Sequence, residues 1–429
     1  MSAHTAVAKV VLENTAGQLD PTFAAGGKAS VYFPDSASSR AHGVAVDTQG
    51  RVLVAAKVGT AEGDRFGLAR LQADGCADLS FGYHGSVIGQ FAAGSDATGS
   101  TLRILKNGHL LLGGLHYEDG QRTLPALALF DQHGHPVNTF GDDGRLVVRL
   151  PGELSMGRRD GWLPPGVPGA EACDLQLLRD GRILLLANHH FDLADHVGLL
   201  ICLLPDGSLD PDFNGRGFVM VRHRLMNSWL GSLTLHGSDH VLVAGSINMP
   251  QEGLLARYTL NGELDEAFAD HGFLRFKADG QGAQVSRVVP LDDERLLCLG
   301  SSRDPMHSLA LVVRDDGQPD DRCNVGEARM LRIGDSLSQW TAALPQPDGC
   351  VLAAGATVGG VEADFTLARY LPDGDLDAGF AKGTGWVRTR LGRSLDTATS
   401  LALQADGGIL VAGYSLDGNY RAVVLRYFG

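Results

Sequence analysis

The residues best suited to binding chemistry are gathered in a segment that interrupts the regular pattern of the chain. Residues 151–172 contain Arg158, Arg159, Asp160 and Trp162 among prolines and glycines. Trp and Arg are frequent anchors of binding surfaces, and long irregular segments inside compact domains often carry function. This segment predicts a loop that contacts a ligand or partner. The alternative is a tolerated surface insertion whose Trp162 covers a sheet edge.

Histidines and carboxylates form a second group of candidates. Four of them lie close together and two more lie one repeat earlier: His189, His190, Asp192 and His196, and then His116 and Tyr117. Imidazole and carboxylate groups bind Zn²⁺ and similar ions, but the spacing here matches no standard ligand motif. We therefore expect these residues to contact a ligand or partner, and we predict no metal site.

A third group is defined by its place in the predicted fold. His42, Cys173, Asp174 and Arg287 fall at matching points of the repeats described below, where a central channel would open. Cys173 is a conceivable nucleophile, but the adjacent Asp174 carboxylate would raise the pKa of its thiol, and no histidine stands at a fixed spacing from it. The four residues are channel-mouth candidates, and no catalytic residue is predicted.

The overall composition narrows the classes of partner. The chain has 429 residues, with 36 Lys and Arg against 50 Asp and Glu and a formal net charge of −14. Such an acidic chain repels phosphate backbones and anionic lipid, so nucleic acid and membrane surfaces are not expected partners. No apolar run reaches the ~18–20 residues of a membrane span, and no signal peptide or Gly-rich phosphate loop is found. We expect a cytoplasmic protein without a cofactor.

Glycine makes up 57 of the 429 residues, nearly twice the usual share, and its positions reveal a repeat. A segment of the type Gly-x-Leu-Asp-x-x-Phe, here called the anchor, recurs seven times and ends at Phe23, Phe81, Phe140, Phe213, Phe268, Cys323 and Phe380. Successive anchors are separated by 58, 59, 73, 55, 55 and 57 residues. The longest spacing contains the insertion 151–172. Val137 is the single replacement of the anchor Asp.

Each repeat contains four short apolar runs, which in the first repeat are 28–33, 44–47, 51–55 and 66–71. The second and third runs are joined by a tight turn whose last residue is Gly at 50, 108, 181, 349 and 407, as in a β-hairpin. Runs of this length without a helical period are strands. The pattern predicts an all-β fold: a seven-bladed β-propeller of four-stranded antiparallel blades, forming one domain over residues 1–429.

Three segments carry a family resemblance: Gly-Ser-Leu-Asp-Pro-Asp-Phe (207–213), Phe-Thr-Leu-Ala-Arg-Tyr-Leu-Pro-Asp-Gly (365–374) and Gln-Ala-Asp-Gly-Gly-Ile-Leu-Val-Ala-Gly (404–413). They resemble the consensus of bacterial delta-60 repeat proteins, and the resemblance extends over residues 17–429. It implies a β-propeller with this repeat count. The family motif is architectural, so the resemblance implies no catalytic residue.

The order of the runs predicts how the propeller closes. If the run 44–47 is the innermost strand, the run 28–33 completes the last blade beside the C-terminal strands 401–428, so that N- and C-terminal strands pair. Residues 6–12 resemble one further strand, which is either an extra outer strand or a dimer contact.

The repeated charges have an architectural explanation. Four arginines recur at one position of one strand: Arg70, Arg257, Arg369 and Arg426. A single active site does not need several copies of one residue. We expect these arginines to contact the anchor Asp residues or the backbone, and to stabilise the fold.

The loops divide into two faces. Hairpin turns and anchors lie on one face, called the anchor face, and vary little between repeats. The other, called the variable face, carries the loops 58–65, 115–124, 188–195, 246–252, 301–307, 356–363 and 414–419 together with the insertion 151–172. Variable loops on a rigid scaffold often carry function.

The composition of the predicted channel mouth bears on whether the protein is an enzyme. The predicted ring at the start of the inner strands contains His42, Ser100, Cys173, Asp174, Gly231, Ser286, Arg287, Thr341 and Thr399. It is mostly small and neutral, unlike the paired carboxylates of general acid–base catalysis. We therefore expect a non-enzymatic binding module that presents the variable face to a protein or carbohydrate partner. The alternatives are a hydrolase or lyase acting at the channel mouth, and a scaffold component of a toxin or larger assembly.

Overall fold

The computed structural model describes residues 16–118, 122–151, 174–190, 196–224, 226–247, 252–291, 294–303, 305–320, 322–323, 328–334, 336–359, 362–392 and 395–429. The predicted strand 6–12 lies outside these ranges. The described chain is built of β-strands, with 3₁₀ turns η2 (Phe213–Gly215) and η4 (Ala381–Gly383). Within it no helix is long and apolar enough to cross a membrane.

Five sheets consist of four antiparallel strands each, in chain order. The first two contain β2 (Ser36–Val46), β3 (Val52–Thr60), β4 (Gly63–Leu71) and β5 (Ser86–Gly89), and β6 (Asp96–Ile104), β7 (Leu110–Glu118), β8 (Arg122–Phe130) and β9 (Arg145–Val147). The next two contain β10 (Asp174–Leu177), β11 (Ile183–His190), β12 (His196–Leu203) and β13 (Phe218–Val221), and β14 (Ser228–His236), β15 (His240–Ile247), β16 (Glu252–Thr259) and β17 (Phe273–Phe276). The fifth contains β18 (Ala283–Leu291), β19 (Arg295–Ser302), β20 (Ser308–Arg314) and β21 (Arg329–Leu331).

The sixth sheet has eight strands and contains both the first and the last strand of the described chain. Its members are β22 (Leu337–Pro345), β23 (Val351–Gly359), β24 (Glu362–Tyr370), β25 (Trp386–Thr389), β26 (Leu395–Leu403), β27 (Ile409–Asp417), β28 (Asn419–Tyr427) and β1 (Lys28–Ser30). One parallel bridge between Ala363 and Leu395 connects β24 to β26. At the far edge β1 pairs antiparallel with β28, with Lys28 opposite Leu425.

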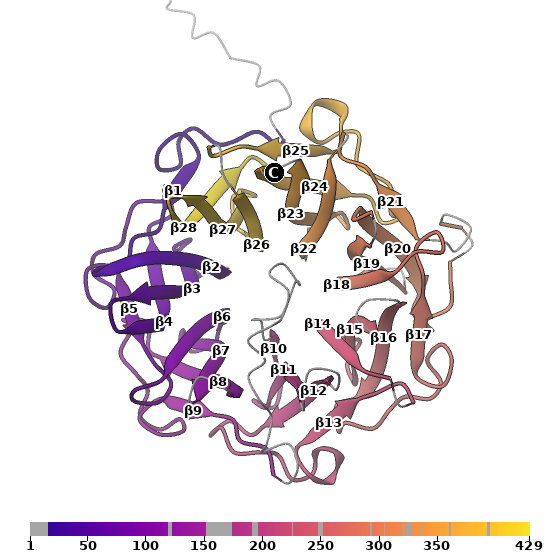
Figure 1. Cartoon of the computed structure of the whole chain (residues 1–429), viewed down its shortest axis with the longest axis horizontal. Coiled ribbons are helices and arrows are strands. Elements are labelled where there is room, and N and C mark those ends of the chain that lie inside the picture. The colour runs from indigo at the N-terminus through magenta and orange to yellow at the C-terminus, as the bar shows by residue number, and fades with distance from the viewer. Residues whose placement is uncertain are drawn as a thin grey trace, which may run out of the picture.

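The sheets are arranged around a common centre, as expected for a β-propeller. Figure 1 shows β2, β6, β10, β14, β18, β22 and β26 nearest to this centre, with the later strands of each sheet farther out. The second apolar run of each repeat therefore forms the inner strand, as predicted.

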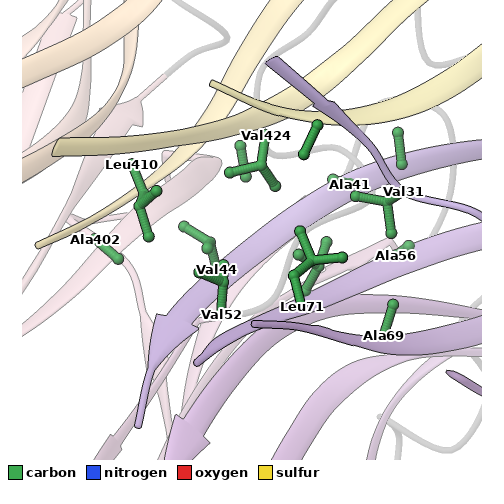
Figure 2. Packing of buried hydrophobic residues seen from close by; sticks show 14 of the residues in the cluster. Val31, Ala41, Val44, Val52, Ala56, Ala69, Leu71, Ala402, Leu410 and Val424 are labelled. Carbon is green, nitrogen blue, oxygen red and sulfur yellow. The ribbon is translucent and has the colours of Figure 1, made fainter. Parts of the chain in front are cut away.

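The sheets are buried on both of their faces, and β3 shows how the sequence achieves this. Successive side chains of a strand point to opposite faces. Val52 and Val54 enter one apolar cluster with Ala412 and Val424 of the last sheet, whereas Leu53 and Ala55 enter another with Leu112 of the next sheet. Figure 2 shows the first of these clusters, in which residues of β2 and β3 pack against those of β27 and β28. A single sheet could not bury both faces alone, so the sheets stabilise one another.

Each anchor packs against the anchor of a neighbouring repeat, and this contact helps to explain the anchor glycine. All seven anchor glycines have positive φ, for example +88° at Gly75. A Cβ on Gly75 would also lie 2.8 Å from the ring of Phe23 in the preceding anchor, and Gly262 has the same relation to Phe213. The residue after the anchor Phe adds a backbone hydrogen bond, as from Ala24 N to the Asp74 carbonyl at 2.7 Å. Glycine is therefore required both by the backbone and by close packing.

The repeated arginines contact the anchor carboxylates, as predicted. Arg70 Nε donates to Asp78 Oδ2 at 2.7 Å, and Arg257 donates to Asp265 at 2.6 Å. Arg70 also donates to the backbone carbonyl of Gln132 in the following sheet. Burial raises the pKa of Asp78, but the hydrogen bonds from Ser80 and the charge of Arg70 outweigh it, so this pKa lies below its usual value. These pairs connect strands and anchors.

Candidate functional site

The residues predicted to ring the channel mouth occupy one repeated feature of the inner strands. The pairing register shifts by one residue in six of these strands, which leaves one extra residue in a β-bulge. The extra residues are His42, Ser100, Gly231, Ser286, Thr341 and Thr399. In β10 the described chain begins at Asp174, so Cys173 lies outside it. The predicted ring is thus a ring of bulges around the centre.

Several polar groups of this ring connect neighbouring inner strands. The Thr341 hydroxyl donates to the Ala398 carbonyl at 2.7 Å, and the Thr399 hydroxyl donates to the Ala41 carbonyl at 2.9 Å. One residue further along, Ser400 Oγ accepts the Val44 N–H at 3.1 Å. These side chains satisfy backbone groups that the bulges leave unpaired, so their role is architectural.

Charged side chains gather on one side of the centre, on β6, β10 and β18. We call Arg103, Asp174 and Arg287 the axial charge cluster. Asp174 Oδ1 accepts from Arg103 Nη2 at 3.1 Å and from Leu175 N at 2.9 Å, while Oδ2 accepts from Leu233 N at 3.2 Å. Both oxygens of this carboxylate are therefore engaged. The sequence pattern does not indicate Arg103, because this residue stands three positions beyond the bulge.

Arg287 is held differently from the other members of the cluster. Its Nη1 donates to the carbonyls of Gly231 and, at 2.7 Å, of Ser286. Arg287 is half-buried, and its guanidinium group reaches from β18 to the neighbouring inner strand β14. This burial lowers the pKa of Arg287, the charge of Asp174 acts in the opposite direction, and Arg103 lowers it further. Arg287 remains a cation at neutral pH, because a guanidinium group does not lose its proton in proteins.

An aromatic and cationic group, here called the rim cluster, lies on the variable face between the first and last sheets. It consists of Arg40 and His42 on β2, Tyr414 on β27 and Tyr420 on β28. The Arg40 guanidinium stacks 3.6 Å from the centroid of the Tyr420 ring and lies 5.7 Å from that of Tyr414. His42 contacts Tyr414 edge-on at 6.2 Å between centroids. All four side chains are half-buried, so each keeps some exposed surface.

Sequence reasoning missed Arg40, Tyr414 and Tyr420, although one signal was present. The other repeats have a different residue at the position of Tyr414: Lys57, Leu115, Asn188, Ser246, Ser301 and Ala356. The tyrosine is the single aromatic residue at this position, which marks a departure from the repeat.

The prediction that His116 and Tyr117 lie in a loop of the variable face is wrong. Both lie in β7 and are buried, with exposures of 1% and 5%, and the Tyr117 hydroxyl lies 3.2 Å from the Thr98 hydroxyl. His189 lies in β11 and His196 is the first residue of β12, and both are buried. The strands extend beyond the apolar runs, because the backbone of the polar residues at their ends also pairs with the neighbouring strands. A contact of these residues with a partner stays a prediction.

The remaining candidates lie at the end of a strand or outside the described ranges. His190 is the last residue of β11. Asp192 and the insertion residues Arg158, Arg159, Asp160 and Trp162 lie outside the described ranges, so their predicted role stays a prediction. Within the described ranges no group of three His, Cys, Asp or Glu residues is placed to hold a metal ion.

A buried histidine and two buried cysteines of the described sheets keep their neutral forms. Burial lowers the pKa of His116, the charge of Glu118 acts in the opposite direction and the charge of Arg149 lowers the pKa further, so the imidazole is neutral at pH 7. Burial raises the pKa of Cys202 to about 12 and that of Cys298 to about 12. These thiols are small buried side chains, and they are not nucleophiles at neutral pH.

Comparisons with known proteins support the fold. A family model described as "Domain of unknown function (DUF5122) beta-propeller" matches residues 346–380 and 404–428. These segments lie in the sixth sheet and its turns. The comparison supports a β-propeller family, while the resemblance to delta-60 repeat proteins stays a prediction. No curated protein matches the chain.

Solved structures of low sequence identity resemble the chain over most of its length. A protein of unknown function from Dyadobacter fermentans DSM 18053 is 12% identical, with a TM-score of 0.46, over 94% of this chain and 98% of that one. The polysaccharide lyase Uly1 is 9% identical, with a TM-score of 0.47, over 97% and 98%. Chaetomium thermophilum Sqt1, bound to the N-terminus of the ribosomal protein L10, is 12% identical, with a TM-score of 0.46, over 92% and 100%.

Proposed function

We propose that the chain is a closed, seven-bladed β-propeller and acts as a non-enzymatic binding module for a protein or carbohydrate partner. If the eight-stranded sheet is divided at the Ala363–Leu395 bridge, its halves and the five other sheets would make seven blades. Three contacts between the chain ends support closure: the pairing of β1 with β28, the ion pair of Asp20 with Arg426, and the packing of Gly17 on Phe380.

The observation that carries the binding function is the different use of polar residues on the two faces. On the face of the anchors, strand arginines donate hydrogen bonds to anchor carboxylates in three of the six sheets. On the variable face, Arg40, Tyr414 and Tyr420 follow no repeat and keep exposed surface. Tyr and Arg combine large contact area with hydrogen bonding and are frequent binding anchors. The rim cluster is therefore the described part of the proposed binding surface.

The axial groups favour binding over hydrolase or lyase chemistry. A general base needs a carboxylate oxygen or imidazole that can reach the proton of a substrate. Asp174 is the carboxylate of the axial charge cluster, and both its oxygens accept hydrogen bonds from Arg103, Leu175 and Leu233. Freeing this carboxylate for catalysis would break contacts between three inner strands.

The test compares two variable-face variants with a tyrosine variant of the anchor face. R40A/Y420A removes the centre of the rim cluster, and R158A/R159A/W162A removes the candidates of the insertion. Y83A is the matched control, because Tyr83 is exposed beside an anchor. All proteins are applied to a glycan array and to cross-linked pull-down with mass spectrometry.

We expect a specific glycan or protein to be retained by the wild type and Y83A, and lost from at least one variable-face variant, with unchanged melting temperatures. Retention by both variable-face variants, or equal loss from Y83A, would contradict the proposed surface. Turnover of a bound glycan that D174N abolishes would favour the enzyme alternative.

A further inference from the structure

The axial charge cluster contains more positive than negative charge. Two guanidinium groups, on Arg103 and Arg287, act on a single carboxylate, that of Asp174. Asp174 forms its direct ion pair with Arg103 at 3.1 Å. No carboxylate of the described ranges lies within ion-pair distance of Arg287, whose hydrogen bonds go to backbone carbonyls. Counted over the described residues, this cluster has an excess of one positive charge in a chain whose net charge is −14.

The geometry of Arg287 leaves one edge of its guanidinium group without a protein acceptor. Both carbonyl contacts use Nη1. Nε and Nη2 have no acceptor among the described residues, and Arg287 keeps partial exposure. The Nε and Nη2 hydrogens point in parallel, which is the arrangement that binds both oxygens of a carboxylate. The carbonyl contacts also fix the orientation of the group before any ligand arrives.

We propose that Arg287 binds the carboxylate of a small organic acid at the centre of the propeller. The ligand would accept two parallel hydrogen bonds from Nε and Nη2, and its single negative charge would balance the excess positive charge beside Asp174. This site is distinct from the rim cluster and does not depend on the proposed function.

Charge and enclosure favour a monocarboxylate over phosphate. A half-buried cation with no carboxylate in direct contact among the described residues is costly, and a monoanion removes this cost without adding a second uncompensated charge. Inorganic phosphate carries more than one negative charge at neutral pH and would leave Asp174 facing an excess of negative charge. A fully exposed arginine, in contrast, would bind both ions weakly and non-specifically.

The test uses acetate as the probe, measured by saturation-transfer NMR on the full chain at constant ionic strength set with sodium chloride. R287K keeps the positive charge but loses the two parallel N–H donors, and R287Q loses both the charge and these donors. R314Q is the control, because Arg314 is a surface arginine paired with Asp316 at 3.1 Å. R40A/Y420A reports on the rim cluster.

We expect saturable acetate binding to the wild type, R314Q and R40A/Y420A, roughly tenfold weaker binding to R287K, and none to R287Q. If R287Q does not fold, the comparison with R287K decides. Absence of acetate binding to the wild type, or unchanged binding to R287K, would overturn the site. Displacement of acetate by inorganic phosphate at equal or lower concentration would overturn the preference for a monocarboxylate. Acetate binding together with failure of the glycan and protein assays would contradict the proposed function and support the Arg287 site.

Discussion

At the scale of single residues, one repeat replaces both members of the anchor ion pair by apolar residues. Val137 stands where other anchors have Asp, and Leu129 stands at the strand position of Arg70. The backbone bond between the two positions is kept, at 2.9 Å from Val137 N to Leu129 O and 3.0 Å from Asp78 N to Arg70 O. Leu129 and Val137 belong to one apolar cluster. A buried carboxylate without a cation would be costly, so here both partners change together. Asp210 is kept although Cys202 stands at the position of the arginine, because Arg182 pairs with Asp210 instead at 3.0 Å.

This replacement predicts how the Arg70–Asp78 pair responds to mutation. R70L and D78V each leave one buried charge without its main partner, and each should lower the free energy of unfolding by about 3 kcal/mol. R70L/D78V copies the Leu129–Val137 pair and should lose less than either single variant. Urea denaturation at pH 7 measures the three values. Additive losses in the double variant would show that the two side chains act independently.

The same pair has a defined dependence on pH. The pKa of Asp78 is lower in the folded chain than its ordinary value of 3.8. The stabilisation is therefore complete above the ordinary value and is lost as the pH falls through the lowered one. The difference in urea stability between wild type and D78V at pH 7 should accordingly shrink in strongly acidic solution. A difference that stays constant with pH would show that the Asp78 charge does not stabilise the fold.

At the scale of the element, the anchor turn combines a backbone requirement with a steric one. Gly75 has φ of +88° and faces the Phe23 ring. Gly108, in a hairpin turn, has φ of +83°, and a Cβ there would meet no atom within 4 Å. G108A should cost about 1 kcal/mol from left-handed strain alone. G75A should cost about 1–3 kcal/mol more than G108A, because its methyl group overpacks against Phe23.

Thermal and urea denaturation of both variants separate the two contributions. Both glycines have similar φ, so the difference between the variants measures the contact with Phe23. Equal losses would show that Phe23 moves aside without cost.

These elements also show why the repeat was predictable and the rim cluster was not. Anchor and hairpin glycines satisfy a local backbone conformation that recurs in each repeat, so the spacing alone located them. Strand ends carry polar residues such as His116, which are typical of loops in sequence patterns although the ladder continues through them. Arg40 and Tyr420 come from opposite ends of the chain and meet only because the first and last sheets are neighbours. Their contact has no local signature.

At the scale of the whole molecule, the two ends of the chain share one sheet and one ion pair. Asp20 occupies the anchor position that pairs with Arg426, just as Asp78 pairs with Arg70. Val31 N, next to β1, donates to the Ala422 carbonyl at 2.9 Å. The first anchor therefore completes the last sheet, and the proposed closed ring has no sheet that is stable by itself.

Removal of the first strand tests this coupling. A variant lacking residues 1–30 loses Asp20, Gly17 and all of β1, which leaves the outer edge of β28 without its partner. We expect a lower melting temperature for the entire fold and concentration-dependent association, because unpaired edges pair with other chains. A variant lacking residues 1–15 keeps these contacts and is the control. Differential scanning calorimetry and size-exclusion chromatography with light scattering measure both effects. Wild-type stability together with a monomeric state in the longer truncation would show that the ends of the chain do not hold the ring closed.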